Sequence, residues 1–204
     1  MLFRSGYTGY TWIQNVKLSS SGDLIVIGCT DSPNFPVSPN VYKTVFPSKY
    51  VNLECFIAKF DNTGKLIFST FLGGENFDEP FGLDIGEGDS ITVVGRTYSL
   101  DFPTSNNAFN STHDSYSSDA FISVLDATGC NLVYSSLLGG VGDKDWATAV
   151  VTRKRNIIAV TGTTFCSNFP ITKNSFGQAY KGGGYYFGDC FVSQLDISLI
   201  GQNQ

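Results

Sequence analysis

Carboxylates recur before three short apolar runs in this chain, and they are the first candidates for chemistry. Glu54, Asp119 and Asp189 each stand directly before such a run. A pair of carboxylates can perform acid–base catalysis when the two groups share one site in different environments. These three are far apart in the sequence and recur in equivalent surroundings. We therefore predict that they accept hydrogen bonds from loop amides and do not form a catalytic pair.

Asp143 and Asp145 raise the possibility of a calcium site, because carboxylate and backbone oxygens are the ligands that Ca²⁺ prefers. The corresponding loops do not repeat this pattern. One holds Asp78 between two glutamates at a different spacing, and the other, residues 7–10, has no carboxylate. A metal site belonging to the repeat would recur, so the sequence predicts no metal site.

The remaining reactive residue types lack catalytic partners. The only histidine, His113, lies in a polar stretch and is predicted to be solvated. No nucleophile elbow or phosphate-binding glycine motif is present, and the five cysteines form no CxxC pair. Cys55 and Cys190 share a repeat position with Ala120, which predicts a small buried residue there. We predict a protein that is not an enzyme and uses no cofactor.

The strongest pattern is an internal repeat. The stretch 95–109 also occurs at 28–42 and at 162–176, with offsets of 95 − 28 = 67 and 162 − 95 = 67. A fixed period of this size marks repeated supersecondary units. The conserved positions are a glycine (Gly28, Gly95, Gly162), a threonine two residues later (Thr30, Thr97, Thr164), a Phe-Pro pair (Phe35-Pro36, Phe102-Pro103, Phe169-Pro170) and an asparagine (Asn40, Asn107, Asn174).

Each unit contains strand-length runs rich in β-branched and aromatic residues, and no segment has a sustained helical period. The predicted strands are 12–18, 24–30, 54–60 and 66–72; then 80–85, 90–97, 119–125 and 132–138; then 146–152, 156–164 and 189–195. Short turns join the first two strands and the last two strands of a unit. Each unit is therefore predicted to be a four-stranded antiparallel meander.

A loop of more than twenty residues joins the second and third strands and opens with the Phe-Pro pair. Proline restricts the preceding residue to an extended backbone, and the phenylalanine ring is a large apolar plug. We predict that Phe35, Phe102 and Phe169 tie the long loops to the sheets and do not bind a ligand.

Four-stranded antiparallel units repeated around an axis make a β-propeller. The order of the motifs, from Leu-Gly-Gly and an acidic loop through Asn/Asp-Phe-Pro to Asp119-Ala120-Phe121 or Asp189-Cys190-Phe191, resembles the SBBP β-propeller repeat. The resemblance covers nearly the whole chain. It implies an all-β propeller fold and a cell-surface or extracellular setting, and it transfers no catalytic residue.

The predicted domain is a single propeller segment, 1–204, with blade repeats at about 12–72, 80–138 and 146–204, and with residues 1–11 supplying the tail of a fourth strand. The third unit holds at most the start of its own fourth strand. Three blades are fewer than the usual four to eight, so one chain is not expected to close the ring. The sequence predicts self-association through open edges, a longer chain, or docking on protein partners.

The predicted function is that of a non-catalytic interaction or structural module, with the long loops as binding surface. Tyr180, Tyr185 and Tyr186 are candidate contacts, although they could equally pack locally. The alternative is a carbohydrate-binding propeller whose pockets are lined by the equivalent aromatics Trp12, Phe81 and Trp146.

The composition argues against two other classes of partner. A net charge of −5 and a pI near 4.7 argue against nucleic acid. No apolar run approaches the length of a spanning helix, so no membrane insertion is predicted.

Overall fold

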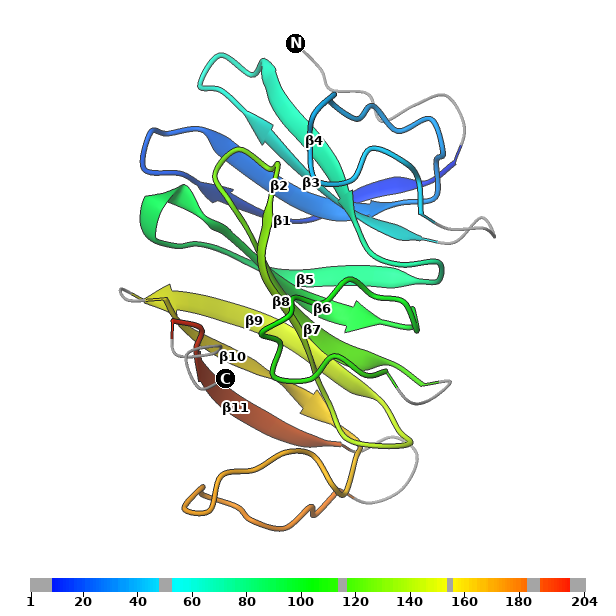
Figure 1. Cartoon of the computed structure of the whole chain (residues 1–204), viewed down its shortest axis with the longest axis vertical. Coiled ribbons are helices and arrows are strands. Elements are labelled where there is room, and N and C mark those ends of the chain that lie inside the picture. Colours follow the sequence, from blue (N-terminus) through cyan, green and yellow to red (C-terminus); the bar gives the residue numbers. More distant parts are fainter. Residues whose placement is uncertain (1–8, 48–52, 114–116, 154–155, 183–187, 199–204) are drawn as a thin grey trace.

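The computed structural model describes residues 9–47, 53–113, 117–153, 156–182 and 188–198, and the regular structure of these ranges is almost entirely β (Figure 1). The strands are β1 (Thr11–Leu18), β2 (Leu24–Thr30), β3 (Glu54–Phe60), β4 (Leu66–Leu72), β5 (Asp78–Ile85), β6 (Ile91–Thr97), β7 (Asp119–Leu125), β8 (Leu132–Leu138), β9 (Asp145–Arg153), β10 (Ile157–Thr164) and β11 (Asp189–Asp196), with one 3₁₀ turn, η1 (Glu87–Asp89). The all-β prediction is confirmed, and every predicted strand lies within two residues of an observed one.

The strands form three antiparallel meanders in chain order. The first sheet is β1-β2-β3-β4 and the second is β5-β6-β7-β8, whereas the third has three strands, β9-β10-β11, in the part of the chain that the structure describes. Residues 1–8, predicted to supply the tail of a fourth strand, and residues 199–204 lie outside the described ranges. The four-stranded unit is therefore confirmed for the first two repeats.

The sheets stack face to face along the long axis of the molecule, with the second sheet between the other two (Figure 1). A hydrophobic cluster lies at each of the two junctions, and β7, whose residues are all buried, contributes to both. One face of the fully buried β3 packs in the first of these clusters, and its other face packs in a third cluster that includes Phe35 and Phe71. The cluster between the first and second sheets includes Ile27, Ile57, Phe68, Leu83, Val93 and Leu125. The cluster between the second and third includes Val94, Ile122, Tyr134, Val150, Val160 and Leu195.

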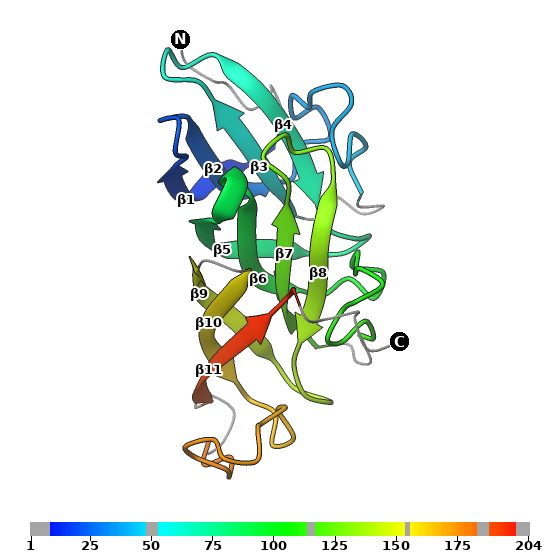
Figure 2. The same cartoon turned by 60° about the vertical axis from the view of Figure 1, so that its left-hand side comes forward.

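The first strands of successive sheets lie next to one another, because β1 contacts β5 and β5 contacts β9. Figure 2 shows these strands toward one side of the molecule and β4 and β8 toward the other. Asp84 of β5 bridges all three sheets. One of its oxygens pairs with Lys17 Nζ of β1 at 3.3 Å. The other accepts the backbone N–H and the hydroxyl of Thr152 of β9, at 2.7 and 2.8 Å.

Glycine and aspartate shape the short turns before β4 and β8. Gly64 and Gly129, in the turns before β4 and β8, have φ of 81° and 70°. These left-handed conformations favour glycine. In the same turns, Asp61 and Asp126 accept the backbone N–H of the residue two positions later. The sequence pattern of each hairpin therefore fixes where the fourth strand starts.

Candidate interaction site

The repeated Thr and Phe of each unit build the same turn three times at the end of its second strand. The threonine hydroxyl accepts the N–H of the residue two positions later, at 3.1 Å for Thr30, 2.9 Å for Thr97 and 3.0 Å for Thr164. The phenylalanine N–H then bonds a carbonyl three residues back in each copy. The long loop therefore leaves every sheet in one direction.

Each phenylalanine of the Phe-Pro pair packs on a phenylalanine of the third strand. The ring centroids are 4.5 Å apart for Phe35 and Phe56, and 4.7 Å apart for Phe102 and Phe121. Phe169 and Phe191 repeat the contact at 4.6 Å. Phe35 and Phe102 are buried, with 4% and 5% of their surface exposed. These contacts agree with the prediction that the Phe-Pro pair anchors the loop.

The repeated glycine is required by the same packing. A Cβ added to Gly95 would lie 2.0 Å from the carbonyl oxygen of Glu79 and 2.7 Å from the ring of Phe121. Gly28 and Gly162 have equivalent neighbours, and their added Cβ atoms would lie 2.0 and 1.9 Å from a carbonyl oxygen. Only glycine lets the first and third strands approach the second this closely.

After the Phe-Pro pair, the loop runs along the outer edge of the fourth strand. In the second sheet, Ser135 Oγ of β8 donates to the Pro103 carbonyl at 2.6 Å, and the Ser105 N–H donates to the Ser135 carbonyl at 2.9 Å. In the first sheet, Ser69 of β4 makes the same bonds to Pro36 and Ser38. The loops therefore cover edges that would otherwise invite strand pairing.

The third sheet has the loop without a fourth strand in the described part of the chain. A groove of about 650 Å³ runs the length of β11, and every residue from Asp189 to Asp196 lines it. The loop contributes Phe169, Pro170 and Tyr180 to the lining, and the second sheet contributes Leu138. This groove occupies the place that β4 and β8 take in the other two sheets.

The outward face of β11 is also apolar and open. Val192 has 79% of its surface exposed, and Cys190 is exposed as well. The prediction of a small buried residue at the position of Cys190 is therefore wrong, although it holds for Cys55 and Ala120, which have no exposed surface. The reason is that the first and second sheets are covered by the next sheet, and the described structure places no sheet over the third.

Carboxyl groups are buried at both junctions between sheets. Asp78 accepts the Gly74 N–H at 2.7 Å and the Ser99 hydroxyl at 2.8 Å. Asp145 accepts the Gly140 N–H at 2.8 Å. The two aspartates are 145 − 78 = 67 residues apart, so the acidic loops do share one position of the repeat. They fix the turn that enters each new sheet.

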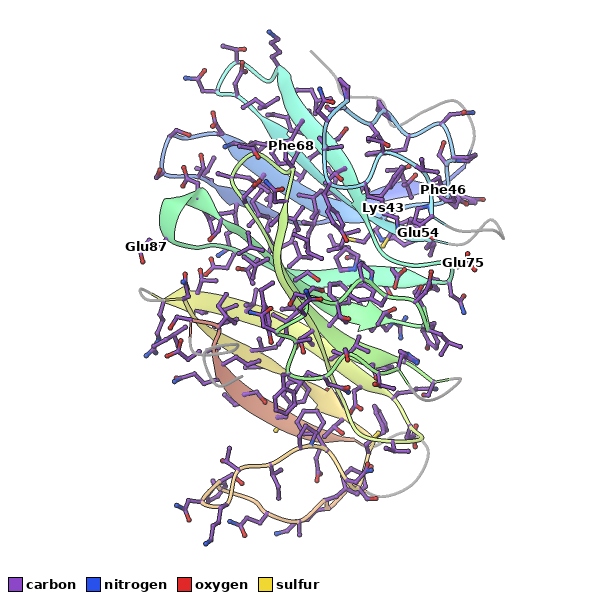
Figure 3. All side chains as sticks on the ribbon, in the orientation of Figure 1. Lys43, Phe46, Glu54, Phe68, Glu75 and Glu87 are labelled. Atoms are coloured by element: carbon purple, nitrogen blue, oxygen red, sulfur yellow. The ribbon has the colours of Figure 1, made fainter. Side chains whose placement is uncertain are left out.

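Glu54 differs from the loop-amide acceptor that its sequence position predicts. Neither of its carboxyl oxygens has a hydrogen-bond partner, and the side chain is fully buried. Burial, followed by the neighbouring charge of Asp78, raises the pKa of Glu54 to about 10, although Lys43 opposes the shift. Burial also raises the pKa of Asp78 to about 7. Figure 3 labels Glu54 and Lys43 at this junction.

The other two carboxylates of the set behave differently from Glu54. Asp189 Oδ2 accepts the Lys181 N–H at 2.5 Å, as predicted for a loop-amide acceptor. A Cβ added to Gly139 would lie 2.8 Å from Asp119 Oδ1 and 2.8 Å from Asp145 Oδ2, so these two carboxyl groups converge on one glycine. In the described ranges, no group of three or more His, Cys, Asp or Glu side chains could hold a metal ion.

The histidine prediction is also wrong. His113 is buried, with 8% of its surface exposed. Its Nε2 donates to the carbonyl oxygen of Thr97 at 3.3 Å. The imidazole therefore packs the second long loop onto the end of β6 and is not a solvated loop residue.

The strand register changes the predicted set of equivalent aromatics. Trp12 pairs with Cys29 and Trp146 pairs with Thr163, and the same place in the second sheet is taken by Glu79, which pairs with Arg96. Phe81 instead lies in the β-bulge of β5, between Pro80 and Gly82. Trp12, Phe81 and Trp146 are therefore not three copies of one position.

Phe81 and Trp146 nevertheless meet around a cation. The guanidinium carbon of Arg96 lies 5.0 Å from the Trp146 ring centroid and 5.8 Å from that of Phe81, with Phe77 and Tyr98 at 5.6 and 5.8 Å. The carboxylate of Glu79 pairs with Arg96 Nη2 at 2.7 Å. Arg96 lies among these four aromatic rings. Its cation–π contacts with the rings and its ion pair with Glu79 stabilise the cluster within the protein.

The remaining candidate contacts are spread over the molecule. Tyr180 lines the groove beside β11. Tyr185 and Tyr186 lie outside the described residues. Trp146 donates its indole N–H to the Ser118 hydroxyl at 3.1 Å, and Trp12 is 36% exposed at the opposite end of the molecule. Of the predicted binding residues that the structure describes, Tyr180 lines the groove, and Trp12 and Trp146 do not.

No family model matches this chain, and no curated protein matches it. The resemblance to the SBBP repeat stays a prediction carried by the motifs. In the described ranges, no helix is long and apolar enough to cross a membrane.

Proposed function

We propose that this chain is a non-catalytic β-propeller segment that acts as an interaction or structural module. The support is the stack of antiparallel meanders whose first strands adjoin one another, as expected around a propeller axis. The motif resemblance to the SBBP repeat supports a cell-surface or extracellular assembly as its setting.

One observation carries the proposal of an interaction role. In the described part of the chain, the edge of β11 borders an open groove, whereas the edges of β4 and β8 are covered by their own long loops. An unpaired strand edge is a template for another strand, and binding modules use such edges to add an extended segment of a partner. The docking site is therefore the groove along β11.

The other two sheets indicate which segment would fit the groove. β4 and β8 both place an aromatic residue, Phe68 or Tyr134, before two small hydroxyl residues and a final leucine. The first hydroxyl in each strand donates to the carbonyl of the repeated proline. Pro170 holds that place in the third sheet and lines the groove. The expected partner presents an extended apolar strand with central serine or threonine residues.

A peptide with the sequence of residues 132–140, labelled with a fluorophore, tests this proposal by anisotropy titration. We expect saturable binding that a scrambled peptide of the same composition does not show. Val192→Asp, which puts a charge into the groove, should weaken binding at least tenfold. Val133→Asp, at an exposed valine of β8 away from the groove, should leave binding unchanged. Equal binding of both peptides, or none, contradicts the proposal.

A further inference from the structure

The outer face of the first sheet exposes a row of aliphatic side chains. Ile13, Val16 and Leu18 of β1 have 62%, 49% and 64% of their surface exposed. They pair with Gly28, Val26 and Leu24 of β2, which alternate along that strand, so all three lie on one face of the sheet. This face looks away from the second sheet.

The counterparts of these residues in the other sheets are mostly buried. A shift of 67 residues takes Val16 to Leu83, which has 2% of its surface exposed, and a shift of 134 takes it to Val150, which has 7%. Ile13 shifts to Pro80, which is buried, and to Ala147, which has no exposed surface. In the second and third sheets this row packs against the preceding sheet. In the first sheet, no other sheet of the described ranges covers this row, whereas the adjoining Val26 of β2 is buried in the cluster that contains Phe35 and Phe71.

The third sheet shows the opposite half of the same contact. Cys190 and Val192 are exposed, whereas Ile57 and Ile122, which correspond to Val192, have no exposed surface because the following sheet covers them. The two ends of the stack are thus the two complementary halves of one interface, which the molecule already forms twice internally.

We propose that the partner at these faces is a second copy of this chain, packed head to tail so that the third sheet of each copy meets the first sheet of the other. A second copy is the one partner certain to present the row of Ile13, Val16 and Leu18. Head-to-tail contacts close into rings when the rotation allows it. Propellers usually have four to eight blades, and six is the only multiple of three in that range. Two copies therefore form a closed ring of six sheets.

This inference rests on the proposed function, because it names the partner of the same end of the third sheet. The two are nevertheless separable. The docking groove requires only β11 and its loop, whereas the ring also requires the outer face of β1.

The mass in solution is the first test. Light scattering coupled to size exclusion should give twice the chain mass of 22.1 kDa, and this value should hold on dilution because both interfaces must open together. A monomer at all concentrations overturns the inference. A mass that keeps rising beyond two copies with concentration overturns the closed ring.

Two charge variants test the head-to-tail arrangement. Leu18→Asp and Val192→Asp each place a carboxylate at one end of the stack, at side chains that are exposed in the single chain, so each variant should fold. Each alone should halve the mass. An equal mixture should recover a two-copy species, because one unmodified first sheet can still meet one unmodified third sheet. No recovery in the mixture, or loss of mass with only one of the two variants, overturns the head-to-tail contact.

Val133→Asp is the matched control, because it adds the same charge at an exposed strand valine away from both ends, and it should keep the wild-type mass. Peptide binding to Leu18→Asp separates the two proposals. Suppose that Val133→Asp and Leu18→Asp both keep the wild-type mass and that the peptide still binds to Leu18→Asp. The second-copy inference then fails and the docking groove stands. If the peptide does not bind to this variant, the docking groove fails.

Discussion

Replacing Glu54 with glutamine should stabilise the protein at neutral and alkaline pH. Glu54 is fully buried without a hydrogen-bond partner for either oxygen, and its pKa is raised to about 10. In the unfolded chain the same group titrates near its ordinary value of 4.5. Between these values the folded state binds a proton that the unfolded state releases, so the free energy of unfolding falls as pH rises. Glutamine is neutral throughout this range.

The size of the effect follows from the pKa difference. One pKa unit corresponds to about 1.4 kcal/mol. At about pH 7 Glu54 is protonated in the folded protein and ionised in the unfolded chain. The difference between this pH and the unfolded-state pKa lowers the free energy of unfolding by up to about 3 kcal/mol. Glu54→Gln removes this penalty. It should therefore raise the free energy of unfolding by up to about 3 kcal/mol near neutral pH and change it little below about pH 4.

The measurement is urea unfolding followed by tryptophan fluorescence at several pH values from about 4 to 9. The free energy of unfolding of Glu54→Gln should separate from that of the wild type progressively as pH rises. Glu87→Gln is the control, because it removes the same charge from an exposed residue at η1 (Figure 3). Its curve should run parallel to the wild-type curve.

Two outcomes would refute the reasoning. If Glu54→Gln follows the wild-type pH dependence, Glu54 titrates in the folded protein near its ordinary pKa and is not held protonated. If the variant is less stable at every pH, the carboxylate is charged and its interaction with Lys43 outweighs the burial, so removing the charge removes a favourable contact.

Three further predictions concern the repeat and the whole chain. Phe102→Ala should lower the free energy of unfolding by roughly 3 to 5 kcal/mol because it removes a buried ring and leaves a cavity. Leu100→Ala, at a residue with 64% of its surface exposed, should change the free energy of unfolding by less than about 0.5 kcal/mol. Equal effects of the two substitutions would mean that Phe102 does not anchor the loop. Gly95→Ala should lower the midpoint of urea unfolding, because its Cβ would collide with the Glu79 carbonyl, and an unchanged midpoint would contradict the close approach of β5 and β6. The wild type should melt at its highest temperature near pH 4 to 5. Burial acts to raise the pKa of Asp126, but its hydrogen bonds together outweigh burial and lower that pKa, so the contribution of Asp126 is lost on acidification. Burial raises the pKa of Asp78 from 3.8 to about 7, so the contribution of Asp78 is lost as pH rises through that range. Calorimetry showing a maximum above about pH 7 would disagree.

The local parts of the fold could be predicted because their causes are local. Runs rich in β-branched and aromatic residues predict each strand, and the short turns between those runs predict each hairpin. The role of Phe102 followed from its proline and from its recurrence at a fixed spacing. Each of these features depends on a few neighbouring residues, so the sequence contains it directly.

The candidate site depends on which sheets have neighbours, and the sequence pattern does not contain that information. Cys190 and Cys55 have the same residue type at the same repeat position, yet one is exposed and the other fully buried. Glu54 and Asp189 also share a position, and only the second bonds a loop amide. The sequence contains the spacing of 67 residues between Asp78 and Asp145. The equivalence of the two residues becomes evident only when the strand pairs are aligned.

Asp84 acts on the geometry of the assembly as well as on the single chain. It contacts β1 through Lys17 and β9 through Thr152, so it constrains how the first and third sheets are placed relative to the second. In a ring, an error in this placement is multiplied by the number of junctions. A deviation too small to disturb one pair of sheets could leave a gap or convert the ring into an open spiral. The contacts of Asp84 within one chain therefore influence whether an assembly of several chains can close into a ring.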